Sequence, residues 1–259
     1  MKTIHYHDHG KGFPIVWIHG FPLSSAIFEP QTKIDGFRHI RPDLRGFGKT
    51  PPADGETSMQ SYAHDVLDVM DKEHIERAVI AGFSMGGYVA MQLLRDAPER
   101  VAALLLLDTR EVADTAEGRA NRMKQADEVA KSGSIASVVE AMLPKMTYRT
   151  DVRDDVRRIM ESSTPQGVVA ALHAMANRAD STETLRNCKV PALVVVGDRD
   201  EITPPRDAER MVALIGHAEE APIAKAAPLA NFERPEQLNP IIHAFLFRHV
   251  LRPEHAAAF

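Results

Sequence analysis

Cysteine is almost absent from this chain, and so is any long apolar run. The 259 residues include one cysteine, Cys188, so no disulfide can form within the chain. No apolar stretch is long enough to span a bilayer, and the first residues lack the apolar core of a secretory signal. We therefore expect a cytoplasmic protein without a membrane segment.

Charge of one sign is also scarce. Lys and Arg total 31 against 36 Asp and Glu, which gives a net charge of −5, and no long block of either sign occurs. Nothing in this balance favours nucleic acid or an anionic membrane as a partner, and we expect neither. Hydrophobic residues make up 44% of the chain, enough for one large core with a small insertion. The oligomeric state is left open.

Apolar runs alternate with amphipathic stretches over most of the chain. This alternation predicts an α/β fold, with a mostly parallel, doubly wound sheet covered by helices on both faces. Strands are expected at 3–6, 14–18, 38–41, 78–81, 101–107, 190–196 and 221–224, with a turn at 8–12. Helices are expected at 58–72, from 85 to near Pro98, at 205–215 and at 236–251.

The stretch 111–179 differs from the rest. It is polar and helical, with predicted breaks at Gly133, Pro144 and Pro165, and it contains no clear strand. Because ligands bind at the carboxyl edge of such sheets, we interpret 111–179 as a helical cap over a core of 1–110 and 180–259. Five cap residues either line an apolar pocket or form the cap's own core: Met142, Met146, Tyr148, Met160 and Met175.

A serine stands at a predicted strand–turn–helix junction. The apolar run 78–81 leads into Gly-Phe-Ser-Met-Gly, with Ser84 at the centre and Gly82 and Gly86 on either side. Such an elbow exposes a hydroxyl on a strained backbone, and the glycines relieve crowding between strand and helix. Ser84 is therefore a candidate nucleophile.

A serine nucleophile needs donors for the oxyanion that forms when it attacks a carbonyl group. The backbone N–H after the nucleophile is one donor, which identifies Met85. The second comes from a loop after an earlier strand, and Phe21 in His-Gly-Phe-Pro is the natural choice. We interpret His19 as a residue that braces this loop rather than as a base.

Aspartates follow two predicted strands. One turn residue separates Asp200 from Asp198 and brings Asp200 off the end of the strand towards the site, so we assign Asp200 as the acid and Asp198 as a brace of the loop. Asp108, at the end of the preceding strand, is an alternative acid. Its other interpretation is a helix N-cap or a turn aspartate.

Five stretches together resemble the α/β-hydrolase superfamily, in particular small capped serine esterases and enol-lactonase-like hydrolases. They are His19–Pro22 (HGFP), Asp43–Gly48 (DLRGFG), Gly82–Gly87 (GFSMGG), Gly197–Pro204 (GDRDEITP) and Leu229–Glu236 (LANFERPE). The resemblance covers nearly the whole chain and implies the α/β-hydrolase fold. Its order of nucleophile, acid and histidine carries over to Ser84 and Asp200.

The histidine of that family does not carry over. It stands just before the Leu-x-Asn-x-Glu-x-Pro-Glu stretch, and here that position is Pro228. Proline has no titratable group and cannot shuttle a proton. Either a working esterase has lost its base, or another histidine replaces it, or the protein binds a ligand without catalysis. Among other histidines, His217, His243 and His249 are poorly placed, whereas His173 in the cap could swing in.

The sequence thus predicts a serine hydrolase of small to medium carboxylic esters or lactones, acting through an acyl-enzyme and impaired by the missing base. A perhydrolase, a carbon–carbon hydrolase or a non-catalytic ligand-binding relative are the alternatives. No cofactor is expected. His5, His7 and His9 alternate along the first strand, which favours a solvated strand face over a metal site. The acyl and alcohol preferences are left open.

Overall fold

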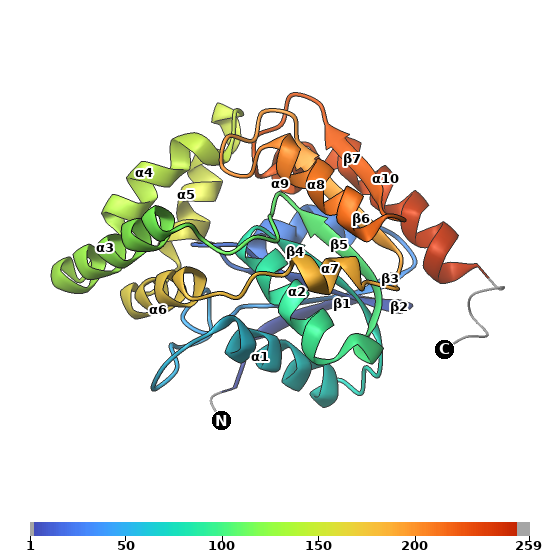
Figure 1. Ribbon diagram of the computed structural model, residues 1–259, viewed down its shortest axis with the longest axis horizontal. Helices are drawn as coiled ribbons and strands as arrows, with labels where there is room; N and C mark the ends of the chain where they lie inside the picture. Colours follow the sequence, from blue (N-terminus) through green and yellow to red (C-terminus); the bar gives the residue numbers. More distant parts are fainter. Residues whose placement is uncertain (1–2, 253–259) are drawn as a thin grey trace.

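A seven-stranded sheet lies at the centre of the computed structural model, which describes residues 3–252 (Figure 1). The strand order is β1-β3-β2-β4-β5-β6-β7. Only β1 runs antiparallel to its neighbour, so the mostly parallel sheet is confirmed. The strands are β1 (Tyr6–Gly10), β2 (Phe13–Ile18), β3 (Phe37–Pro42), β4 (Ala78–Phe83), β5 (Val101–Leu107), β6 (Ala192–Gly197) and β7 (Glu219–Ile223).

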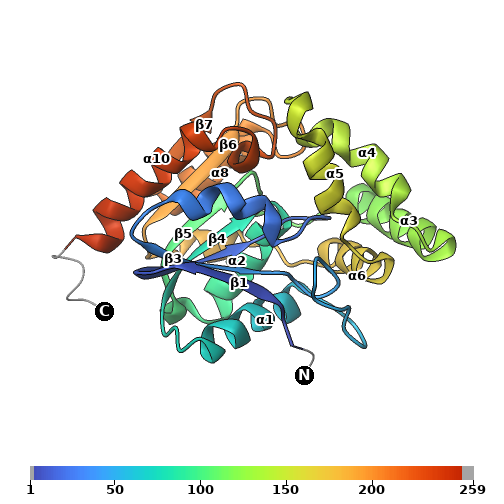
Figure 2. The same ribbon diagram turned by 180° about the vertical axis from the view of Figure 1, so that it is seen from behind.

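Helices cover both faces of the sheet, as the continuous apolar runs of β4, β5 and β6 require. On one face, a contiguous layer comprises α1 (Met59–Lys72), α2 (Met85–Asp96), α7 (Thr182–Arg186) and α8 (Pro205–Ile215). On the other, visible in Figure 2, η1 (Ser25–Lys33), α9 (Ala230–Glu233) and α10 (Pro235–Leu246) lie together. The shorter elements are the 3-10 turns η2 (Pro98–Arg100) and η3 (Thr150–Val152) and a final π-helical segment η4 (Phe247–Leu251).

Most expected elements are present, with three local exceptions. The strand expected at 3–6 is wrong for residues 3–5, because β1 begins at Tyr6 and pairs with β3 as far as Gly10. The turn expected at 8–12 is therefore wrong for its first three residues, where Asp8 pairs with Ile40. The break expected at Pro144 is also wrong. This proline lies inside α4, near its end, and the helix is held by the burial of Leu143 and Met146.

Four helices form a group beside the sheet (Figure 1): α3 (Ala116–Ser132), α4 (Ala136–Met146), α5 (Arg153–Glu161) and α6 (Pro165–Ala176). The two ends of this insertion are tied together. Ser181 N–H donates to the carbonyl of Glu111 at 2.9 Å, and Arg178 donates to the carbonyl of Val112 at 2.8 Å. These contacts support our proposed division into a cap at 111–179 and a core on either side of it.

The cap touches the core through glycine. A Cβ on Gly167 would stand 2.2 Å from the carbonyl oxygen of Gly46, so α6 and the 43–50 loop approach backbone to backbone. Thr164 donates to the same carbonyl from its N–H and its hydroxyl, each at 3.0 Å. These bonds fix the start of α6 against the loop. Every helix within residues 3–252 is too short or too polar to cross a membrane.

Candidate active site

Ser84 occupies the turn between β4 and α2. Its backbone has φ 50° and ψ −113°, a left-handed region that non-glycine residues seldom adopt. Two hydrogen bonds hold this conformation: Ser84 N–H donates to the carbonyl of Leu107 at 2.9 Å, and the hydroxyl of Thr109 donates to the carbonyl of Ser84 at 2.8 Å. The side chain is half-buried, and within the described chain its hydroxyl caps no N–H of α2.

The flanking glycines are required by crowding. A Cβ on Gly86 would lie 2.0 Å from the carbonyl oxygen of Ile18, and one on Gly82 would lie 2.3 Å from that of Gly86. Both obstacles are backbone atoms, which cannot rotate away. The expected close approach of strand and helix at the elbow is confirmed.

The loop after β2 packs directly against this elbow. A Cβ on Gly20 would meet the ring of Phe83 at 2.7 Å, so the next residue, Phe21, is held close to the turn. Met85 is the first residue of α2, where backbone N–H groups have no acceptor inside the helix. The two predicted oxyanion donors therefore belong to adjoining segments.

His19 braces the loop, as predicted. Leu44 N–H donates to Nε2 at 3.0 Å, so the ring proton is on Nδ1, which donates to the carbonyl of Gly20 at 2.9 Å. The ring is fully buried, and burial lowers the pKa of His19. A neutral imidazole with both nitrogens engaged has no capacity left to serve as a base.

Asp200 is buried in the turn after β6. One carboxylate oxygen accepts from Ile202 N–H at 2.7 Å and from Thr203 N–H at 2.9 Å, and the other accepts from the Thr203 hydroxyl. Burial raises the pKa of Asp200 despite these bonds. Asp198 is exposed and accepts from Ala226 N–H at 3.2 Å, which confirms its assignment as a brace.

Asp108 is buried beside Asp200, and its interpretation as a helix N-cap is wrong, because the next helix begins at Ala116. One oxygen accepts from Gly197 N–H at 2.8 Å, whereas within residues 3–252 the other oxygen, Oδ2, has no hydrogen-bond partner. Burial raises the pKa of Asp108 well above its usual range, and the charges of Asp200 and Glu233 add to this effect.

Because of Asp108, the free energy of unfolding should therefore fall as the pH rises. The folded protein keeps this proton at pH values where the unfolded chain has lost it. The contribution is thus fully present below about pH 4 and is lost as the pH rises through the folded-state pKa. We expect Asp108→Asn, which cannot ionise, to unfold at a higher temperature than the native chain at pH 8.

Thermal unfolding of the native and Asp108→Asn proteins from pH 4 to pH 8 checks this expectation. The gain in stability from Asp108→Asn should shrink towards zero at pH 4. At pH 8 it should reach roughly 1–3 kcal/mol, the cost of one unsatisfied buried group. Asp200, Glu233 and Arg110 lie nearby, but they are common to both proteins. A difference that does not depend on pH would contradict the argument.

Pro228 is buried in the turn before α9. Its neighbours are fixed on both sides: Ala227 N–H donates to Glu233 at 2.9 Å, and Leu229 N–H donates to the carbonyl of Met146 in the cap at 3.1 Å. A Cβ on Gly197 would lie 2.4 Å from the carbonyl oxygen of Ala227, so this turn lies against the strand end that binds Asp108.

Glu233 is a site-supporting residue that sequence reasoning missed. It is fully buried, and its carboxylate accepts from the N–H groups of Tyr148 at 3.0 Å, Arg149 at 2.9 Å and Ala227 at 2.9 Å. It thereby joins the cap to the turn that carries Pro228. The available signal was its place in the LANFERPE stretch.

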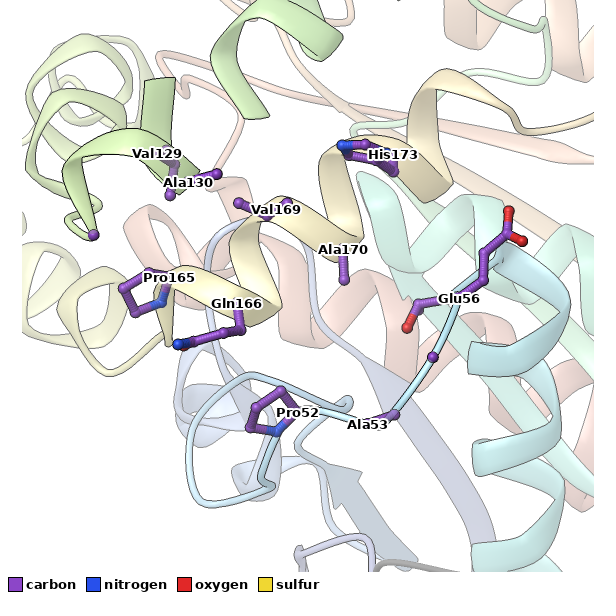
Figure 3. Close-up of a pocket in the computed structure, with 13 residues that line it drawn as sticks. Pro52, Ala53, Glu56, Val129, Ala130, Pro165, Gln166, Val169, Ala170 and His173 are labelled. Atoms are coloured by element: carbon purple, nitrogen blue, oxygen red, sulfur yellow. The ribbon is translucent and has the colours of Figure 1, made fainter. Parts of the chain in front are cut away.

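His173, the predicted alternative base, faces a cavity of about 530 Å³ instead (Figure 3). The cavity lies between α3, α6 and the 52–57 loop, and Figure 3 shows Val169, Ala170 and His173 along its α6 wall. Ser84 is not among the described residues that line it. These three residues lie on a different face of α6 from Gly167, which contacts the core.

The remaining candidate histidines lie away from Ser84. His217 Nε2 bonds to the carbonyl of Val190 at 2.9 Å, and His249 Nε2 to Glu219 at 2.9 Å. Both partners stand at the amino ends of β6 and β7, the edge opposite the elbow. His243 stacks on a ring of the final helical segment. Within residues 3–252, no hydrogen bond or ring contact joins these three histidines, or His173, to the elbow.

Other predicted candidates have structural contacts. Met146, Met160 and Met175 belong to the hydrophobic core, Met142 is partly buried against it, and Tyr148 is exposed with Arg199 over its ring. In the first strand region, the ring of His5 bonds to Asp43 at 3.0 Å and packs edge-on against His7. His9 pairs with His39 of β3.

The matched family model decides the classification. Residues 14–235 match the model of the alpha/beta hydrolase fold. The chain belongs to the α/β-hydrolase family. Its most similar relatives include the AB hydrolase superfamily protein YisY of Bacillus subtilis, 30% identical over 94% of this chain and 95% of the relative. A 3-oxoadipate enol-lactonase of Acinetobacter baylyi is 26% identical over 90% of this chain and 88% of its own.

A solved α/β-hydrolase structure supports the same classification. A thermophilic esterase from Thermogutta terrifontis superposes with a TM-score of 0.92 at 34% identity, over 95% of this chain and 94% of the esterase. The predicted fold and the resemblance to esterases and enol-lactonases are therefore confirmed. Relatives of this chain thus include an esterase and an enol-lactonase.

Proposed function

We propose that this α/β-hydrolase is a serine hydrolase of small to medium carboxylic esters or lactones, impaired by the absence of a general base. The observation that carries the proposal is the strained backbone of Ser84 at the β4–α2 turn, with the Phe21 loop packed against it. Backbone strain at a half-buried hydroxyl is typical of a presented nucleophile rather than of an ordinary turn.

In the proposed reaction, Ser84 Oγ attacks the ester carbonyl carbon. The N–H groups of Phe21 and Met85 stabilise the oxyanion, and the leaving alkoxide takes up the proton that Ser84 loses. Water then hydrolyses the acyl-enzyme, which releases the carboxylic acid and returns a proton to Ser84. Asp200 is the carboxylate that would orient an imidazole at position 228. With Pro228 there, the Ser84 proton has no acceptor of suitable pKa, so only the oxyanion donors and substrate binding remain, worth about 10³–10⁴ over water.

A fluorophosphonate probe tests this proposal without requiring turnover. We expect slow but complete labelling of the native protein at Ser84, located by mass spectrometry of its peptides. The label should be absent from Ser84→Ala and should form faster in Pro228→His, where a base can take the hydroxyl proton.

Two results would argue against a serine hydrolase. Label on another residue would reject Ser84 as the nucleophile. Failure of both the native protein and Pro228→His to react would favour the non-catalytic ligand-binding alternative. Thr109→Val, which removes the hydroxyl that bonds to the Ser84 carbonyl, serves as a folded comparison.

A further inference from the structure

Three buried carboxylates lie around the position of the missing base, and they differ in how well they are satisfied. Glu233 accepts from three backbone N–H groups. Asp200 accepts from two N–H groups and a hydroxyl. Asp108 accepts from one N–H only, and in the described part of the chain its Oδ2 is buried without a partner. An unsatisfied buried acceptor is costly, so a missing donor needs an explanation.

Asp108 is linked through its neighbours both to the nucleophile and to the turn that carries position 228. The residues on either side of it, Leu107 and Thr109, bind the backbone of Ser84. Its own Oδ1 binds Gly197 N–H, and Gly197 contacts the turn that carries Pro228. A ring N–H presented from position 228 would thus enter a space bordered by both Asp200 and Asp108.

We propose that Asp108 is a second positioning carboxylate of this site, whose Oδ2 accepts the ring N–H of a base at position 228 together with Asp200. The proposal rests on the proposed function, because it gives the orientation of that function's missing base. Pro228 then removes two things at once, the proton acceptor for Ser84 and the donor that Asp108 Oδ2 lacks.

The neighbouring carboxylates explain how the chain folds without that donor. Asp200 lies close enough to Asp108 to hydrogen-bond with it when one of the two is protonated, and burial favours one shared proton over two charges. The titratable and charged groups around this position are Asp108, Asp198, Asp200, Glu233, Arg110 and Arg149. A histidine introduced at 228 would replace the shared proton with a ring N–H.

The test compares Asp108→Asn and Asp200→Asn, each in the Pro228→His background. Asp65→Asn is the matched control, because Asp65 is also buried but pairs with Arg45 away from the turn. The first readout is the downfield proton NMR signal of the ring N–H that Pro228→His introduces, which needs no catalysis. The second is the pH dependence of kcat/KM for p-nitrophenyl acetate.

We expect the downfield signal in Pro228→His and in the Asp65→Asn control, and its loss or marked upfield shift with Asp108→Asn. A carboxylate beside the ring favours imidazolium, so Asp108→Asn should move the rising limb of the pH profile down by about one unit. It should also lower the plateau at least about tenfold, as loss of a residue that orients a functional group does. Asp108→Ser, tested in parallel, covers a folding defect in Asp108→Asn.

Each outcome decides between alternatives. If Asp108→Asn and Asp108→Ser leave the signal and the limb in place while Asp200→Asn removes them, Asp200 alone orients the base and the inference is wrong. If the signal depends on Asp108 but Pro228→His hydrolyses no ester, the inference holds and the proposed function fails.

Discussion

Pro228→His is expected to raise ester hydrolysis by at least about 10³-fold over the native chain. Loss of the histidine from a serine triad elsewhere costs about 10⁶ in turnover, which sets the ceiling for restoration. We expect less than the ceiling because position 228 is buried and tightly fixed, so the larger ring must shift its neighbours to reach both Ser84 and the carboxylates. Turnover of p-nitrophenyl acetate measures the gain.

Matched variants separate a restored base from a relaxed turn. Pro228→Asn offers polar atoms but no group that titrates near neutrality, and Pro228→Ala only removes the ring, so neither should gain activity. The gain should vanish in Pro228→His combined with Ser84→Ala. If the native chain already runs at ordinary esterase rates and histidine adds nothing, position 228 is not the place of the base.

Glu233→Ala should lower the free energy of unfolding more than any other substitution proposed for this site. It leaves the N–H groups of Tyr148, Arg149 and Ala227 without their acceptor, and each unsatisfied buried N–H costs about 1–3 kcal/mol. Because water can reach the exposed segment near Tyr148, we expect about 3 kcal/mol in total rather than the full sum. For a chain of this size, that corresponds to a fall in Tm of about 6–12 °C.

Thermal unfolding and limited proteolysis of the cap measure this effect. Glu233→Gln keeps one carbonyl oxygen and should lose about half as much. The cap connection through Tyr148 and Arg149 should become more susceptible to protease in Glu233→Ala. The Leu229–Met146 bond and the bond from the Arg149 side chain to the backbone carbonyl of residue 233 then hold this turn to the cap without help from the carboxylate. Unchanged Tm in Glu233→Ala would mean that water or a shifted side chain satisfies these donors.

The sequence by itself determined the elements and their order. The Gly82–Gly86 spacing between an apolar run and a helical pattern identified the elbow, because its steric demand is local to the chain. The apolar runs of β4, β5 and β6 predicted a buried parallel sheet for the same reason. Pro228 could also be recognised from sequence, since a proline can never supply a titratable group.

Only the tertiary structure decided which distant groups share one environment. The pairing of β5 with β6 brings the carboxyl of Asp108 to Gly197 and Asp200. The packing of the cap on the core brings the N–H of Tyr148 to Glu233. β1 lies later in the chain than predicted, at Tyr6–Gly10, because β3 supplies its partners there, and His173 faces a cavity because of how α6 packs. Such contacts join residues far apart along the chain, and no local pattern encodes which buried acceptor will be left without a donor.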